Sequence, residues 1–96
     1  MKLWIDDERP VPDDSWQFAF NIRDAQFLLE SFREDLEHVS FDYVLGHGEY
    51  GDELLRWMIA QDIKPVKVTV HSSGSAANEL MIKIAANAGI EATVFS

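Results

Sequence analysis

The sequence predicts an α/β three-layer sandwich built on a mostly parallel five-stranded sheet. Two observations carry this prediction. From residue 16 onward, short apolar segments that fit strands alternate strictly with longer segments of helical periodicity. The chain has 96 residues, of which 47% are hydrophobic, so it contains enough apolar material for one core. Because no repeat, low-complexity tract or linker interrupts the pattern, residues 1–96 are predicted to form a single domain.

The first two predicted strands are joined by a polar loop. Residues 3–5 form a short apolar segment, and residues 16–20 alternate large apolar with smaller or polar side chains, as strands do. The loop between them, residues 7–15, contains Pro10 and Pro12 and shows no helical pattern. A loop of this length is short for a parallel crossover. The second strand therefore pairs with the first either in parallel, through an extended loop, or antiparallel.

The next two predicted elements are a helix and a strand. Asn21 is a suitable N-cap, and Asp24 lies near the positive end of the helix dipole. The helix is predicted over residues 21–37, where apolar side chains recur at spacings of three and four: Ala25, Leu28, Leu29, Phe32 and Leu36. Residues 39–45 then alternate as a third strand and lead into a glycine-rich loop.

The remaining elements continue the alternation. A second helix is predicted over residues 52–61, and a fourth strand over 66–71. A short serine- and glycine-containing loop, residues 72–75, leads into a third helix that Gly89 ends. Residues 90–95 form the last predicted strand.

Composition narrows the classes of function. The formal net charge of −9 argues against binding a nucleic-acid backbone, which needs clustered Lys and Arg. The same charge fits simple solubility, a cation site, or an acidic surface that meets a basic protein partner. The absence of cysteine excludes disulfides and thiolate zinc sites. No apolar run is long enough to cross a bilayer, and the first residues are unlike a signal peptide, so we expect a cytoplasmic protein without a membrane partner.

Polar side chains stand at the ends of three predicted strands. Asp6 and Asp7 follow the first strand, Asp42 lies in the third, and His71 ends the fourth. In a parallel sheet these ends meet at one edge, where open α/β folds place their ligands. Asp6, Asp7 and Asp42 are therefore predicted to bind a hard divalent cation, Mg²⁺ or Mn²⁺, although Asp42 could instead cap a backbone amide.

The same edge offers groups for a phosphate. Ser72 and Ser73 precede a helix, whose free amides and dipole favour an anion. Arg9 could hold that anion with two hydrogen bonds, or form a surface ion pair with Glu8 or Asp13. His71 is either a general acid or base or a hydrogen-bonded core histidine.

Three segments resemble the motifs of one family. Residues 3–10, Leu-Trp-Ile-Asp-Asp-Glu-Arg-Pro, are similar to the opening of cyclic-phosphate processing receiver domains. Residues 40–46, Ser-Phe-Asp-Tyr-Val-Leu-Gly, and the stretch that begins at His71-Ser72 resemble the middle and late motifs, with Met81 at the expected distance. The resemblance implies a receiver/flavodoxin-like fold, here lacking the final helix. It also implies a site built from Asp6, Asp7, Glu8, Arg9, Asp42, His71 and Ser72.

Two functions follow as expectations. The resemblance implies a metal-assisted phosphoesterase for cyclic phosphates, with catalytic Asp42 and His71 and a small phosphate-containing ligand. The middle motif departs from the family pattern, because Tyr43 and Val44 replace its His and second Asp. The alternative is therefore an acidic binding or inhibitory module with an eroded site, which acts on a basic protein through the acidic end of its first helix.

Overall fold

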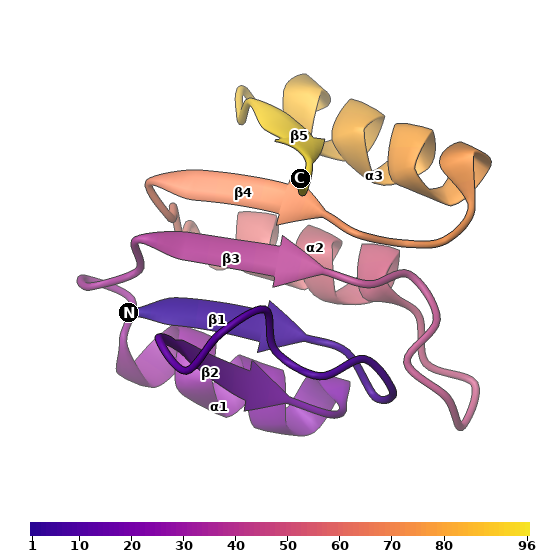
Figure 1. The fold of residues 1–96 in the computed structure, drawn as a ribbon. Coiled ribbons are helices and arrows are strands. Elements are labelled where there is room, and N and C mark those ends of the chain that lie inside the picture. The colour runs from indigo at the N-terminus through magenta and orange to yellow at the C-terminus, as the bar shows by residue number, and fades with distance from the viewer.

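A computed structural model describes all 96 residues and contains the predicted five-stranded sheet. The strand order is β2-β1-β3-β4-β5, and every neighbouring pair is parallel (Figure 1). The strands are β1 (Lys2–Ile5), β2 (Trp16–Ala19), β3 (His38–Phe41), β4 (Lys67–Val70) and β5 (Ala92–Val94). The pairing of β2 with β1, which the sequence left open, is thus parallel through an extended loop.

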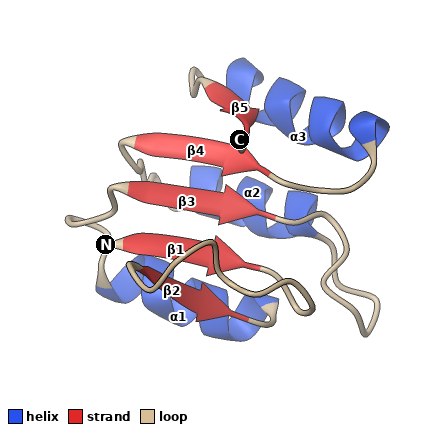
Figure 2. Cartoon of the chain, viewed as in Figure 1, coloured by secondary structure: helices blue, strands red, loops and turns tan.

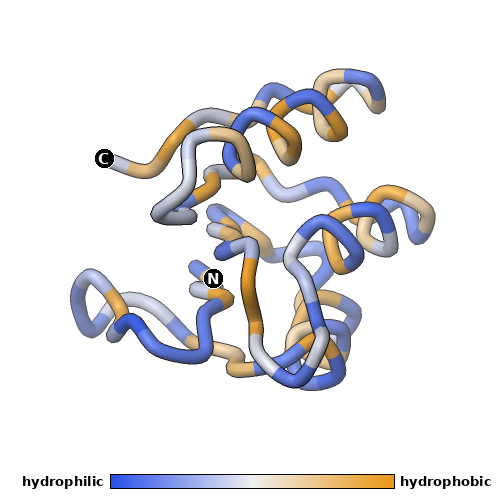
Figure 3. Tube along the Cα trace, turned by 90° about the vertical axis from the view of Figure 1, so that its right-hand side faces the viewer, coloured by the Kyte–Doolittle hydropathy of each residue, from blue (hydrophilic) through white to orange (hydrophobic).

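The three helices all cover one face of the sheet. They are α1 (Ile22–Ser31), α2 (Gly51–Ala60) and α3 (Ser75–Asn87), and each packs against the next (Figures 1 and 2). The opposite face carries the loop of residues 6–15, which Figure 3 shows on the far side of the sheet from the helices. The third layer of the predicted sandwich is therefore this loop and the side chains beneath it, and no helix follows β5 within the 96 residues.

Strand register sorts the side chains between the two faces. Leu3 and Ile5 pair with Val39 and Phe41, and all four are fully buried in the core beneath the helices. Burying an aliphatic or aromatic side chain of this size stabilises the fold by about 1.5–3 kcal/mol. The alternate positions form the loop-covered face, where buried aromatic and polar side chains share the surface: Trp4, Trp16, His38, Ser40 and Thr69.

Two elements end several residues earlier than the sequence predicts, and the last residues of the other elements differ by a single residue or less. Helix α1 ends at Ser31 instead of residue 37, and its last turn is followed by Glu34 and Asp35, whose negative charges the helix C-terminus disfavours. Strand β3 ends at Phe41 because its neighbours β1 and β4 end level with it, at Ile5 and Val70. The predicted cap is confirmed, since the side chain of Asn21 accepts a hydrogen bond from the amide of Asp24. No helix has the length and apolar composition to cross a membrane.

Candidate functional site

The carboxyl ends of β1, β3 and β4 surround a small acidic cavity. Its volume is about 140 Å³. Asp6, Asp7 and Asp42 each offer an oxygen atom, and these three atoms lie within 4.8 Å of one another. Glu8, Arg9, Val44, Ser72 and Ser73 complete the lining. The predicted convergence of the three strand ends is therefore present.

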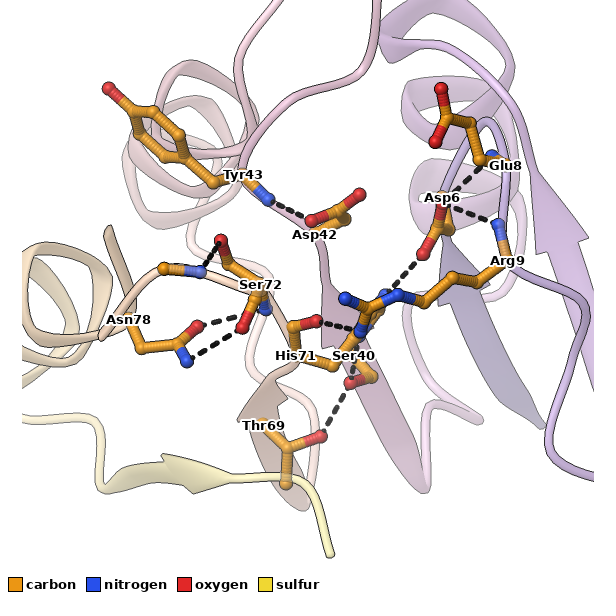
Figure 4. A network of polar contacts seen from close by, with 11 residues as sticks. Asp6, Glu8, Arg9, Ser40, Asp42, Tyr43, Thr69, His71, Ser72 and Asn78 are labelled. Carbon is orange, nitrogen blue, oxygen red and sulfur yellow. Dashed lines mark hydrogen bonds and ion pairs between the residues drawn. The ribbon is translucent and has the colours of Figure 1, made fainter. Parts of the chain in front are cut away.

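Asp6 organises the turn that leaves β1. Its side chain is 1% exposed, and its Oδ1 accepts hydrogen bonds from the amides of Glu8 (2.8 Å) and Arg9 (2.9 Å), as Figure 4 shows. An aspartate that binds amides two and three residues ahead stabilises a tight turn. This turn brings the side chain of Arg9 back over the end of β4, where its Nη1 donates to the carbonyl oxygen of His71 at 2.6 Å.

A chain of hydrogen bonds runs from Asp6 across the loop-covered face of the sheet. The imidazole of His71 lies 3.0 Å from Asp6 (Nε2 to Oδ2) and 2.8 Å from Ser40 (Nδ1 to Oγ). Ser40 is 2.8 Å from Thr69, and Thr69 is 2.8 Å from Nε2 of His38. These contacts form a relay, which we define as Asp6, His71, Ser40, Thr69 and His38.

The direction of every bond in the relay follows from the Asp6 carboxylate. A carboxylate only accepts, so His71 donates from Nε2 and accepts at Nδ1. Ser40 then donates to His71 and accepts from Thr69, which in turn accepts from Nε2–H of His38. Each hydroxyl makes one donated and one accepted bond, so the whole buried relay is satisfied.

Both histidines of the relay are neutral at physiological pH. Burial lowers the pKa of His71 to about 4, against the opposing effect of the Asp6 carboxylate. Burial, together with the positive charges of Lys67 and Lys2, lowers the pKa of His38 to about 4. The contact between Asp6 and His71 is therefore a hydrogen bond to a neutral ring, although its geometry also fits a salt bridge.

The surroundings of Asp42 disfavour its charged form. Its burial and the neighbouring Asp6 carboxylate raise its pKa to about 6, and Asp7 adds to this effect. The amide of Tyr43 donates to Oδ1 at 2.8 Å and Arg9 lies nearby, and both oppose the rise. Three clustered carboxylates favour a cation that neutralises their repulsion. Their hard oxygen atoms are the ligands that Mg²⁺ and Mn²⁺ prefer, so the residues fit the predicted metal.

Two glycines make room for the residues of the acidic cavity, one for a side chain and one for the backbone. Gly46 has φ +77°, and a Cβ atom there would lie 2.8 Å from Oδ2 of Asp7. Gly51, the first residue of α2, leaves even less space, because its Cβ would lie 1.8 Å from the carbonyl oxygen of Asp42. The cavity therefore depends on glycine at both positions.

The loop before α3 is held internally rather than left open. Asn78 accepts from the amide of Ser72 (2.9 Å) and donates to its carbonyl oxygen (3.0 Å), and Ser72 Oγ accepts from the amide of Gly74 (Figure 4). Two of the amides predicted to meet an anion are thus already used. The amide of Ser73 makes no hydrogen bond within the protein, so it is available to a ligand.

The structure brings most of the predicted site residues to one place. Asp6, Asp7, Asp42, Arg9, Ser72 and Ser73 all line the acidic cavity. His71 lies behind them, 5% exposed, with both ring nitrogens hydrogen-bonded. His38, Thr69 and Asn78 were not predicted as site residues. His38 and Thr69 could have been noticed from the sequence, because they are polar residues at strand positions that alternate with apolar residues.

The fold and site define a receiver-like domain. A solved structure with the same fold is the signal receiver domain of a Vibrio parahaemolyticus protein, which is 19% identical to this chain. The TM-score is 0.66, and the match covers 97% of this chain and 75% of that one. The cyclic-phosphate processing receiver domain family matches residues 1–87, and the chain belongs to this family. No curated protein matches the chain.

Proposed function

We propose that the chain is a phosphoesterase that opens cyclic phosphates with the help of a divalent cation. The observation that carries this proposal is the convergence of three carboxylates with one guanidinium in a cavity at the sheet edge. Asp6, Asp7 and Asp42 would hold Mg²⁺ or Mn²⁺. When bound, such a cation polarises a phosphoryl oxygen and lowers the pKa of a coordinated water.

The remaining residues bind and orient the phosphate. Only Nη1 of Arg9 is engaged, so its other guanidinium donors can meet a phosphate oxygen. Ser72 and Ser73 also line the cavity, and the Ser73 amide has no partner within the protein. Ring opening forms one bond from a water oxygen to phosphorus and breaks one ring P–O bond. One proton of the water ends on the released hydroxyl, the other stays on the phosphate or passes to solvent, and the product is a phosphomonoester.

In this proposal His71 orients the site instead of carrying the proton itself. Its two nitrogens are occupied and its ring is neutral. The bond from Nε2–H fixes Oδ2 of Asp6, while the turn amides fix Oδ1. A carboxylate held at both oxygens is preorganised for a cation, in the way that outer-sphere partners orient metal ligands.

The proposal is tested by ³¹P NMR with a panel of cyclic phosphates, including 2′,3′-cyclic nucleotides, in the presence of Mg²⁺ or Mn²⁺. We expect the cyclic phosphate signal to convert to a monoester signal only when the cation is present. Asp42→Asn should lower the rate by at least about 100-fold, because it removes charge from the cation site. Lys83→Gln on α3 serves as a control away from the cavity.

Absence of turnover across the panel would contradict the proposal and favour the alternative of an acidic interaction module. One observation supports that alternative. A hollow at the other end of the sheet is lined by Glu34, Asp35 and Glu37 beside Val66, which is 89% exposed. A basic protein held there would form a complex that weakens as salt rises.

A further inference from the structure

A second cavity adjoins the acidic one. It lies between the loop of residues 6–15 and the end of β5, and its volume is about 410 Å³. Arg9 and Ser72 line both cavities, so a ligand whose phosphate meets Arg9 extends into this second space. We propose that this second cavity, which we call the aromatic groove, is a binding site for a flat heteroaromatic group, such as a nucleobase, attached to the phosphate. The inference rests on the proposed function, because it names the substituent of that substrate.

The walls of the groove are rings with flat apolar faces. Phe95 and Trp4 form one side, with ring centroids 5.1 Å apart and an angle of 76° between their planes. Pro10 and Pro12 of the loop of residues 6–15 also line the groove, and Val94, 52% exposed, adds an aliphatic side chain. Such walls favour a flat ring, which gains stacking contact, over a polyol, which would lose hydration.

Trp4 is held rigidly in this wall. Its indole stacks on the imidazole of His71 with centroids 3.7 Å apart and planes 7° apart. Trp16 and Phe95 contact it edge-on. The groove is therefore largely preformed, so little conformational entropy is lost when a ring binds.

The Trp4 indole also carries an unmatched donor. Its Nε1 is the one buried side-chain nitrogen or oxygen in the protein without a hydrogen-bond partner. Buried polar groups are nearly always paired. This nitrogen is covered from solvent, so it does not select the ligand by itself. The preference for a heteroaromatic ring rests on the stacking faces of the groove and on its junction with Arg9.

The size and charge of the groove set the ligand class. Its volume lies at the small end of ligand pockets, which span about 300–1,000 Å³. It takes one ring system with its sugar rather than a polymer. Arg9 is the one charged side chain in its lining, and it stands at the junction with the acidic cavity. The anionic part of the ligand is thereby directed toward the cation site and the ring away from it.

The test compares two ligands that share the same cyclic phosphate ring. Adenosine 2′,3′-cyclic phosphate and glycerol 1,2-cyclic phosphate are titrated at low temperature with Mg²⁺ while the tryptophan indole ¹H–¹⁵N resonances are followed. We expect adenosine 2′,3′-cyclic phosphate to bind about tenfold more tightly, because stacking of one base contributes a factor of this order. The Trp4 resonance should shift with this ligand and stay in place with the glycerol ester.

A matched pair of variants assigns the effect to the groove. Phe95→Leu should lower the affinity for adenosine 2′,3′-cyclic phosphate about tenfold and leave that for the glycerol ester unchanged. Phe27→Leu is the control, because Phe27 is 71% exposed on α1 and lies outside the groove. Should Phe95→Leu fail to fold, the ligand comparison on the unaltered chain still decides the question.

The outcomes separate this inference from the proposed function. Equal affinity and equal turnover of the two cyclic phosphates would overturn the aromatic site and leave the phosphoesterase intact. If adenosine 2′,3′-cyclic phosphate shifts the Trp4 resonance, the glycerol ester does not, and neither ester is opened, the groove is confirmed and the proposed function is wrong. If no ligand binds, both are overturned.

Discussion

Gly51→Ala should destabilise the protein by about 3 kcal/mol or more, at or beyond the upper end of the usual overpacking cost of about 1–3 kcal/mol, because the added methyl group meets fixed backbone atoms. The added Cβ would lie 1.8 Å from the carbonyl oxygen of Asp42, 2.9 Å from its carbonyl carbon and 3.2 Å from Cα of Tyr43. All three atoms are backbone, so no rotamer change relieves the contact. The hydrogen bond from Gly51 to the carbonyl of Tyr43 ties the same two segments together.

Thermal unfolding followed by circular dichroism measures the effect. A loss of this size lowers the melting temperature of a domain of about 100 residues by at least about 12 °C. Gly74→Ala is the matched control, because its nearest neighbours would lie 3.9 and 4.0 Å from the added Cβ, which is ordinary contact. We expect the control to cost less than about 1 kcal/mol. Similar melting temperatures for the two variants would show that α2 does not begin against Asp42 as described.

Asp6→Ala should also lower the free energy of unfolding by about 3 kcal/mol or more, because each hydrogen bond to a charged group contributes about 1.5–3 kcal/mol. The substitution removes the acceptor of three donors at once: the amides of Glu8 and Arg9, and Nε2–H of His71. Chemical denaturation measures the loss. Asp7→Ala, which removes a carboxylate that is not fully buried, is the control and should cost much less.

Asp6→Asn separates the structural role of Asp6 from its charge. The two turn amides still require an oxygen at Oδ1, so the new NH₂ group must face His71. His71 then accepts at Nε2 and donates from Nδ1, and every later bond of the relay reverses. We expect ¹⁵N NMR to show His71 and His38 as Nε2–H tautomers in the unaltered protein and as Nδ1–H tautomers in the variant. Unchanged tautomers in the variant would contradict the relay.

The acidic site could be predicted because it depends on topology alone. Once the strands are parallel and adjacent, Asp6, Asp7 and Asp42 must emerge at one edge, whatever the details of packing. The end of α1 could not be placed in the same way. Leu36 continues the helical spacing of apolar residues and is buried, yet it reaches the core from the turn after the helix.

The relay and the aromatic groove depend on register, which a single sequence does not reveal. Thr69 stands level with Ser40 only because β3 and β4 pair as they do. A shift of β4 by one residue would place the hydroxyl of Thr69 among the core side chains and away from Ser40. The exact path of the loop of residues 6–15 likewise decides which rings line the groove, and two prolines restrict that path without defining it.

A Mn²⁺ titration followed by electron paramagnetic resonance tests the cation site directly, because bound and free Mn²⁺ give distinct signals. We predict one bound Mn²⁺ per chain, displaced by excess Mg²⁺. We also predict that Asp42→Asn weakens Mn²⁺ binding by at least about tenfold, since loss of one carboxylate ligand has an effect of this order or larger. Saturable binding that Asp42→Asn leaves unchanged, or no binding at millimolar Mn²⁺, would show that the carboxylates at the sheet edge do not form a cation site.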